Sequence, residues 1–289
     1  MGFAAKKSLG QHFLFNPSTI DKILDCARIQ KSDRVLEIGP GPGAMTRRLV
    51  KRAGLVLAVE KDHRFATVLH QELGSENFQI LEEDFLSLSL EKALSCSEQR
   101  GQSPVSPGTG WKVVANLPYN IATETIFHLL EFNSFFSSFH LMVQREVADR
   151  LVAKPGSKDY GILSIFTQLF SENKIVMKLP PGAFSPPPKV HSAVVSFKVS
   201  EECRFPIHHL PTFESVVRIS FSQRRKMIRN SLRELFSLYP PSKIEEALKK
   251  AGVQPTQRPE TIPIEGFAVL SNKLARDEKP LSPGASRKK

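Results

Sequence analysis

Cysteine is scarce in this chain, with only Cys26, Cys96 and Cys203 among 289 residues. Their number is odd and they lie far apart, which argues against a disulfide framework and against a zinc site of paired cysteines. The eight histidines show no ligand-like spacing with cysteines or carboxylates. We therefore expect no bound metal, and reduced thiols in a cytosolic type of compartment.

Long apolar runs are also missing. No apolar segment reaches the roughly 20 residues that cross a bilayer. Residues 1–11 lack the apolar core of a signal peptide. We expect no membrane segment and a cytoplasmic protein.

Acidic residues are fewer than basic ones. The chain has 29 Asp and Glu and 40 Lys and Arg, which gives a formal net charge of +11. This excess favours a polyanionic partner, with nucleic acid ahead of a membrane surface. The apolar fraction of 40% is ordinary for a globular protein. A chain of this length can bury one large core and carry a second, smaller domain.

Short apolar segments alternate with amphipathic ones in the first half of the chain. Strands are expected at 34–38, 55–59 and 78–81, and helices at 17–28, 44–52 and from residue 61 to 73. This alternation predicts a parallel, doubly wound α/β sheet. Further strands are expected at 111–115, 139–143 and 192–199, with a buried helix at 161–170.

The pattern of strands and helices divides the chain into three parts. We expect a catalytic domain at 1–200, a helical, RNA-binding domain at 201–275 and a basic, disordered tail at 276–289. Residues 95–110 are polar and rich in Ser, Gly and Pro, and predict a surface excursion without catalytic chemistry.

A glycine cluster, Gly39-Pro40-Gly41-Pro42-Gly43, follows the first of these strands and precedes a helix. Such a loop lets the backbone approach a nucleotide-like ligand, and Glu60 at the end of the next strand can accept hydrogen bonds from ribose hydroxyls. Enzymes that bind NAD share this logic. The spacing lacks the third glycine of GxGxxG, and Glu37 before the loop would oppose a pyrophosphate. Both details favour S-adenosylmethionine, whose sulfonium and ammonium groups are positive.

The segment after the strand at 111–115 carries the strongest sign of chemistry. It reads Asn116-Leu117-Pro118-Tyr119. Pro118 biases Leu117 away from the helical region, so an Asn oxygen and a backbone carbonyl can both face a cleft as acceptors for one NH2 group. Tyr119 offers a flat face to a base. The alternative is a tight turn in which Asn caps, Pro stiffens and Tyr packs.

Seven segments occur in an order that resembles the small-subunit ribosomal RNA adenine N6-dimethyltransferases (KsgA type). They are SLGQHFL (8–14), LEIGPGPGAMT (36–46), VEKD (59–62), EDFL (83–86), NLPYN (116–120), FSPPPKVHSAVV (184–195) and FSQRRKMIRNSL (221–232). The resemblance covers residues 8–268. It implies a class I methyltransferase: a mainly parallel seven-stranded sheet with one antiparallel strand, and a small helical C-terminal domain.

The resemblance also implies roles for individual residues. Those expected to contact S-adenosylmethionine are His12, Leu14, Gly39, Glu60, Asp84 and Asn116. Asp84, at the end of the third strand, is placed to accept from the adenine amino group of the cofactor, although it could equally be a helix N-cap. Residues expected at the reacting adenine are Asn116, Leu117, Pro118, Tyr119 and Phe184, with Tyr119 and Phe184 as ring clamps for a base taken out of its stack. Phe184 could instead anchor the core.

Basic residues gather between 218 and 233 with no acidic residue among them. Those expected to contact RNA phosphates are Arg218, Arg224, Arg225, Lys226, Arg229 and Arg233, with Lys189 extending the patch. Arg225, Arg229 and Arg233 recur every four residues, which predicts one stripe of a helix. The alternative is a solvated helix face.

The resemblance implies dimethylation of two adjacent adenosines near the 3′ end of small-subunit ribosomal RNA, by a monomer acting on a pre-30S particle. Two other functions stay open. One is a non-catalytic RNA-binding assembly or transcription factor on the same fold, which would not need the intact glycine, Glu60, Asp84 and NLPY segments. The other is a DNA or large-subunit RNA adenine methylase, which FSQRRK disfavours.

Overall fold

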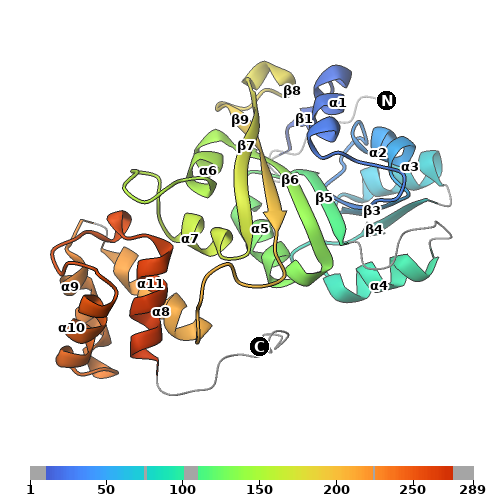
Figure 1. The fold of residues 1–289 in the computed structure, drawn as a ribbon. Helices are drawn as coiled ribbons and strands as arrows, with labels where there is room; N and C mark the ends of the chain where they lie inside the picture. Colours follow the sequence, from blue (N-terminus) through green and yellow to red (C-terminus); the bar gives the residue numbers. More distant parts are fainter. Residues whose placement is uncertain (1–10, 75–76, 101–109, 224, 276–289) are drawn as a thin grey trace. The chain divides into compact units, whose positions relative to one another are not determined.

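The computed structural model describes residues 11–74, 77–100, 110–223 and 225–275. Its centre is a seven-stranded sheet in the order β4-β3-β2-β5-β6-β9-β7 (Figure 1). The strands are β2 (Arg34–Ile38), β3 (Leu55–Glu60), β4 (Phe78–Glu82), β5 (Trp111–Asn116), β6 (Phe136–Gln144), β7 (Ser171–Leu179) and β9 (Ser192–Val199). All neighbouring pairs are parallel except those of β9, which runs antiparallel to both β6 and β7. The predicted class I methyltransferase fold is confirmed.

Helix α1 shows how the sequence builds the layer over one sheet face. It spans Pro17–Cys26, begins with Pro17 in its first turn, and is capped by the Asn16 side chain, which accepts from the Thr19 N–H. Its apolar residues Ile20, Ile23 and Leu24 are at most 1% exposed. Burying each such side chain stabilises the fold by about 1.5–3 kcal/mol.

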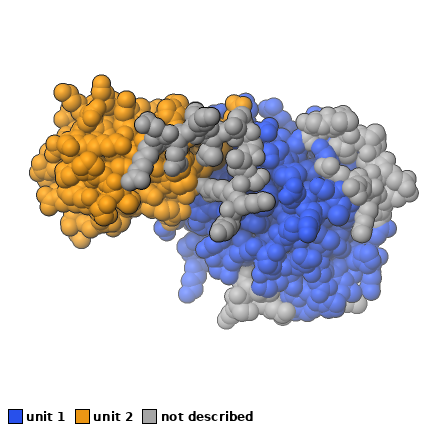
Figure 2. Space-filling view, turned by 90° about the horizontal axis from the view of Figure 1, so that it is seen from below, with its two compact units in different colours: residues 1–148, 171–201 blue, residues 149–170, 202–289 orange. Residues whose placement is uncertain are grey.

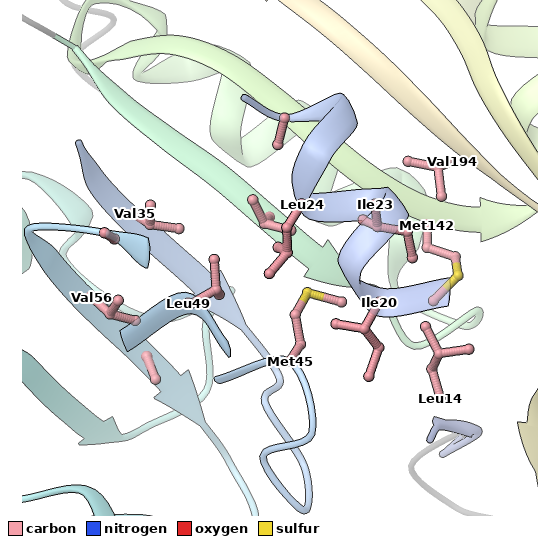
Figure 3. Close-up of a cluster of buried hydrophobic side chains, with 14 of the residues drawn as sticks. Leu14, Ile20, Ile23, Leu24, Val35, Met45, Leu49, Val56, Met142 and Val194 are labelled. Atoms are coloured by element: carbon pink, nitrogen blue, oxygen red, sulfur yellow. The ribbon is translucent and has the colours of Figure 1, made fainter. Parts of the chain in front are cut away.

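This apolar stripe joins a core that the sheet and three helices share. Besides α1, the helices are α2 (Thr46–Arg52) and α3 (His63–Leu73), which contribute Leu49 and Leu69 to the cluster. Figure 3 shows Ile23 of α1 beside Met142 and Val194 of the sheet. The remaining helices that follow the sheet strands are α4 (Leu90–Arg100), α5 (Ala122–Glu131) and α6 (Arg145–Leu151).

Two elements differ from the sequence expectations. Residues 95–100, expected as part of an irregular excursion, are the end of α4, because Leu90, Ala93 and Leu94 place one face of that helix in the core. Residues 101–109 of the excursion lie outside the described residues. Strand β7 at the sheet edge was not predicted, although its residues alternate between exposed ones, such as Glu172 and Lys174, and less exposed ones, the pattern of a half-buried strand.

The chain forms two compact units, coloured separately in Figure 2. The first comprises residues 1–148 and 171–201 and holds the sheet. The second comprises residues 149–170 and 202–289. Residues 149–170, which the sequence analysis placed in the first domain, thus pack with the C-terminal helices. The tail at 276–289 lies outside the described residues, and the functions assigned to the domains stay predictions.

The second unit is helical within its described part. Its helices are α7 (Ile162–Gln168), α8 (Leu210–Ser222), α9 (Ile228–Ser231), α10 (Pro241–Lys250) and α11 (Ile264–Leu274). Helix α8 buries Phe213, Val216 and Val217, and α11 buries Phe267 and Leu270. None of the helices in the described ranges is long and apolar enough to cross a membrane.

Candidate active site

A cleft opens at the carboxyl edge of the central parallel strands, where ligands bind in doubly wound folds. The loops after β2, β3, β4 and β5 each contribute to it, as does the segment before β1 (Phe13–Leu14). Most of the predicted site residues line this cleft together: His12, Gly39, Glu60, Asp84, Asn116, Leu117, Pro118 and Tyr119. Of the residues predicted to contact the cofactor or the reacting adenine, Leu14 and Phe184 do not line it.

All three glycines of the loop after β2 have a positive φ, and two of them, Gly39 and Gly41, line the cleft. Gly39 has φ +66°, in the left-handed region that other residues rarely adopt. Gly41 has φ +53°, and a Cβ there would lie 2.9 Å from Cε1 of Phe13. The loop therefore lies close against the segment of Phe13, which also lines the cleft.

Glu60 is held rigidly at the end of β3. Its Oε1 accepts from the Asp62 N–H over 2.8 Å and its Oε2 from the Gly41 N–H over 3.0 Å. The side chain is 6% exposed, and burial raises the pKa of its carboxyl. Both oxygens keep a further lone pair, so the carboxylate can still accept from hydroxyl groups in the cleft.

The position of Glu37 contradicts the expectation that it places a negative charge before the glycine loop. It lies beneath the loop, 2% exposed and outside the cleft lining, and its Oε2 accepts no hydrogen bond within the described part of the chain. Burial raises its pKa to about 8, so the carboxyl is mostly protonated at neutral pH. Glu37 therefore places no full negative charge before the loop, and the acidity of the cleft comes from Glu60, Glu83 and Asp84.

Asp84 carries the charge that Glu37 does not. Its Oδ2 pairs with Nζ of Lys61 over 2.7 Å, and its Oδ1 accepts from the Leu86 N–H over 3.1 Å. The bond from Lys61 is the main reason that the pKa of Asp84 is lowered. Asp84 is thus an ionised acceptor that lines the cleft.

The side-chain amide of Asn116 has one defined orientation. Its Nδ2 donates to the backbone carbonyl of His12 over 2.8 Å. A carbonyl oxygen can only accept, so the NH2 end must face His12 and Oδ1 is left as the acceptor on the cleft side. The next residue is anchored by its N–H, which donates to the Met142 carbonyl over 3.1 Å.

Tyr119 is held at both ends. Its hydroxyl lies 2.6 Å from Oγ of Ser192, and its ring is stacked with the His12 ring, with centroids 5.4 Å apart and planes at 28°. Burial raises the pKa of this phenol. The His12 Nδ1 lies 2.7 Å from the carbonyl oxygen of Pro186. Because that oxygen can only accept, Nδ1 is the protonated ring nitrogen and donates this hydrogen bond.

His12 thus does more than the sequence analysis assigned to it. Its carbonyl orients Asn116, its ring supports Tyr119, and its Nδ1 holds the segment after β8 (Phe184–Ser185). Pairing of the short strands β1 and β8 brings these segments together, and no local sequence pattern reports it. A cofactor contact by His12 stays a prediction.

Leu14 and Phe184 face each other in the β1–β8 pair. Each is 5% exposed and belongs to the same apolar cluster as α1. The structure therefore places Phe184 in the core position that was its alternative interpretation. Its role as a ring clamp and the cofactor contact of Leu14 stay predictions.

The basic residues near 225 do not form one helical stripe, and that prediction is wrong. Helix α8 ends at Ser222, and α9 starts only at Ile228 and lasts four residues before a 3-10 turn over Leu232–Ser237. The break occurs because the N–H of Ile228 donates to the Gln257 carbonyl, while Ile228 and Leu232 are fully buried.

The side chains themselves are still presented to solvent. The exposed members of the predicted set are Arg218, Arg225, Lys226, Arg229 and Arg233 in the second unit and Lys189 in the first. Arg218 also lies over the Phe166 ring, 5.0 Å from its centroid. Arg224 lies outside the described residues. Phosphate contacts by this set stay predictions.

A seven-stranded sheet with one antiparallel strand, and an acidic cleft beyond the ends of its central strands, define a class I methyltransferase. The sequence model of a family described as Ribosomal RNA adenine dimethylase matches residues 2–276. The chain belongs to this family, as the resemblance in its motifs predicted. The family and the fold imply use of S-adenosylmethionine.

Individual relatives are similar in sequence to this chain over almost its whole length. Two bacterial proteins named Ribosomal RNA small subunit methyltransferase A are similar to it. The protein from Cereibacter sphaeroides is 42% identical over 95% of this chain and 94% of its own length. The protein from Alkaliphilus oremlandii is 38% identical over 95% and 93%.

Two solved structures share the fold at appreciable sequence identity. A dimethyladenosine transferase from Plasmodium falciparum has a TM-score of 0.72 and 26% identity, over 90% of this chain and 96% of that one. The 23S rRNA methyltransferase ErmE has a TM-score of 0.66 and 28% identity, over 91% and 99%.

Proposed function

We propose that this protein transfers methyl groups from S-adenosylmethionine to N6 of adenosine in small-subunit ribosomal RNA, giving N6,N6-dimethyladenosine. The relatives named for the small subunit support this substrate. We further propose that the targets are two adjacent adenosines near the 3′ end, in a pre-30S particle in the cytoplasm, and that the protein acts as a monomer.

The observation that carries the proposal is the orientation of Asn116. With Nδ2 bound to the His12 carbonyl, Oδ1 can accept one hydrogen of an adenine NH2 group. The backbone carbonyl of Leu117, in the same wall of the cleft, can accept the other. Two acceptors at one amino group favour a pyramidal nitrogen, whose lone pair is then less delocalised into the ring.

This arrangement needs no strong base. Adenine N6 is a poor nucleophile because its lone pair belongs to the ring system. Fixed acceptors that hold the nitrogen in its reactive geometry act through positioning and electrostatic preorganisation. Tyr119, whose ring is braced by His12 and whose hydroxyl is held by Ser192, would stack on the extruded base.

The acidic groups of the cleft fit the cofactor. Glu60 offers lone pairs for two ribose hydroxyls, and ionised Asp84 offers one for an adenine amino group. Carboxylates that line the cleft also suit a ligand that carries positive charge. When bound, S-adenosylmethionine would supply the electrophilic methyl group.

Mass spectrometry of nucleosides tests the proposal. Small ribosomal subunits from a methylation-deficient strain are incubated with the protein and S-adenosylmethionine, and fully methylated subunits serve as the matched control. We expect N6,N6-dimethyladenosine to appear near the 3′ end in the first sample and no gain in the second. Cofactor and RNA binding without product would instead favour the non-catalytic assembly factor. Product only on large subunits would favour the large-subunit methylase.

A further inference from the structure

The first unit carries a second groove, separate from the cleft. Residues 15–22 form one side of it, from the end of β1 into α1, and residues 177–185 form the other, from the end of β7 through β8. It shares no lining residue with the cleft. The β1–β8 pair lies between them, because Phe13 lines the cleft while Phe184 and Ser185 line the groove.

An exposed aromatic ring marks this groove. Phe15 is 51% exposed, although its neighbours Leu14 and Ile20 are buried. Its ring meets that of Phe13 edge to face, with centroids 6.2 Å apart, and Phe13 itself lines the cleft. A fixed, solvent-facing ring is a platform on which a nucleic-acid base can stack whatever its identity.

The charge of the groove has one sign. Lys22 and Lys178 line it and are exposed, and neither has an ion-pair partner among the residues that the structure describes. None of the described lining residues is acidic. Lys61, which lines the cleft, is by contrast paired with Asp84. Unpaired ammonium groups beside an exposed ring fit a phosphate backbone with free bases.

We propose that this groove binds an unpaired stretch of the substrate RNA next to the adenosine in the cleft, with a base on Phe15 and phosphates at Lys22 and Lys178. The inference rests on the proposed function, since it supplies the RNA. The two regions are joined through the segment that bears His12 and Phe15, and through the bond from His12 Nδ1 to the Pro186 carbonyl. A base leaves its stack more readily when its neighbours are held apart by the protein.

Binding of oligouridylate, measured by fluorescence anisotropy with the full chain, tests the groove without offering an adenine to the cleft. We expect Phe15→Ala and Phe15→Leu to weaken binding about 5-fold or more, because loss of stacking costs roughly 1–3 kcal/mol per base. Phe15→Trp should restore it. Lys22→Gln and Lys178→Gln should each lower the salt slope by about 0.7, the value for one contact with a single strand. Lys31→Gln, at an exposed lysine outside the groove, is the matched control.

The outcomes separate this proposal from the proposed function. If affinity and salt slope are unchanged in all groove variants, the groove does not bind RNA. This conclusion holds whether or not the wild type methylates ribosomal subunits. Slower methylation of subunits with normal oligouridylate binding would assign the groove to a protein partner and also overturn it. Tighter binding after removal of residues 1–10, with no further effect of Phe15→Ala, would make the chain's own N-terminus the occupant. Phe15-dependent binding by a wild type that methylates no adenine would support the groove and contradict the proposed function.

Discussion

The side-chain amide of Asn116 donates from Nδ2 to the backbone carbonyl of His12 over 2.8 Å. These residues are 104 positions apart in the chain, and the bond decides which end of the amide faces the cleft. The ring of the same histidine is stacked on Tyr119. A single residue before β1 therefore orients both the acceptor and the aromatic face that the proposed reaction requires.

Substitutions of Tyr119 should separate its ring from its hydroxyl. Tyr119→Phe keeps the ring on His12 and loses the bond to Ser192, which is worth about 1 kcal/mol net, so kcat/KM should fall less than about 5-fold. Tyr119→Ala loses the stacking surface and should lower kcat/KM by roughly 5- to 150-fold. Methylation kinetics on small subunits measure both. Equal losses in the two variants would mean that the hydroxyl, and not the ring, matters.

Glu60→Gln should weaken cofactor binding more than its loss of charge alone suggests. Both oxygens of Glu60 accept from backbone N–H groups, so an NH2 group at either place sets donor against donor. We expect S-adenosylmethionine affinity, measured by calorimetry, to fall about 5-fold or more, because a lost pairing of a buried group costs roughly 1–3 kcal/mol. RNA affinity should stay the same. Wild-type cofactor affinity in this variant would remove Glu60 from the cofactor site.

Glu37 should make the stability of the protein depend on pH. Its pKa is raised from 4.5 to about 8 in the folded state, so between these values the folded protein keeps a proton that the unfolded chain has released. Unfolding free energy must then fall as pH rises through this range. Glu37→Gln imitates the protonated form and should lose that dependence.

Denaturant unfolding at pH 5 and pH 8 measures the effect. The difference in free energy of unfolding between Glu37→Gln and wild type should shift in favour of the variant from pH 5 to pH 8. The shift should be on the order of a few kcal/mol, since each unit of pKa shift corresponds to about 1.4 kcal/mol. Glu91→Gln, at an exposed position of α4, is the control. Parallel pH profiles for wild type and Glu37→Gln would show that Glu37 is ionised in the folded protein.

The basic residues of the second unit should contribute to RNA affinity through charge. Replacement of Arg225, Lys226 and Arg229 by Gln should reduce the slope of log K against log salt by close to one unit for each true phosphate contact. These side chains are exposed, so the free energy of unfolding should change little. Lys249→Gln and Lys250→Gln on α10 are matched controls in the same unit. An unchanged slope in the triple variant would remove these residues from the interface.

The buried strands could be predicted from the sequence because their signal is local. The strand predicted at 192–199 occurs at the same residues, and those at 34–38 and 55–59 differ by at most one residue. The helix break before Ile228 was missed because a tertiary contact decides it, whereas β7 does show the local alternation of a half-buried strand. The break depends on the Gln257 carbonyl, and only the partner of β7, which is β9, needed the structure to identify it.

The candidate site could be predicted from the sequence to about the same extent as the fold. Motif residues at strand ends, such as Glu60 and Asn116, meet in one cleft because parallel strands end at one edge of a sheet. The part played by His12 could not be predicted, because it depends on the pairing of two short strands far apart in the chain. The protonation of Glu37 could not be predicted either, since it follows from burial and not from residue type.

The chemical step of Asn116→Ala tests the central claim most directly. Single-turnover methyl transfer to small subunits is compared for this variant and the wild type, with cofactor and RNA affinities measured alongside. Removal of one preorganised group typically costs about 10²–10³ in rate. We predict a loss of at least that size with RNA affinity within about tenfold of wild type. A rate near that of the wild type would contradict the assignment of Asn116 as the acceptor that holds adenine N6.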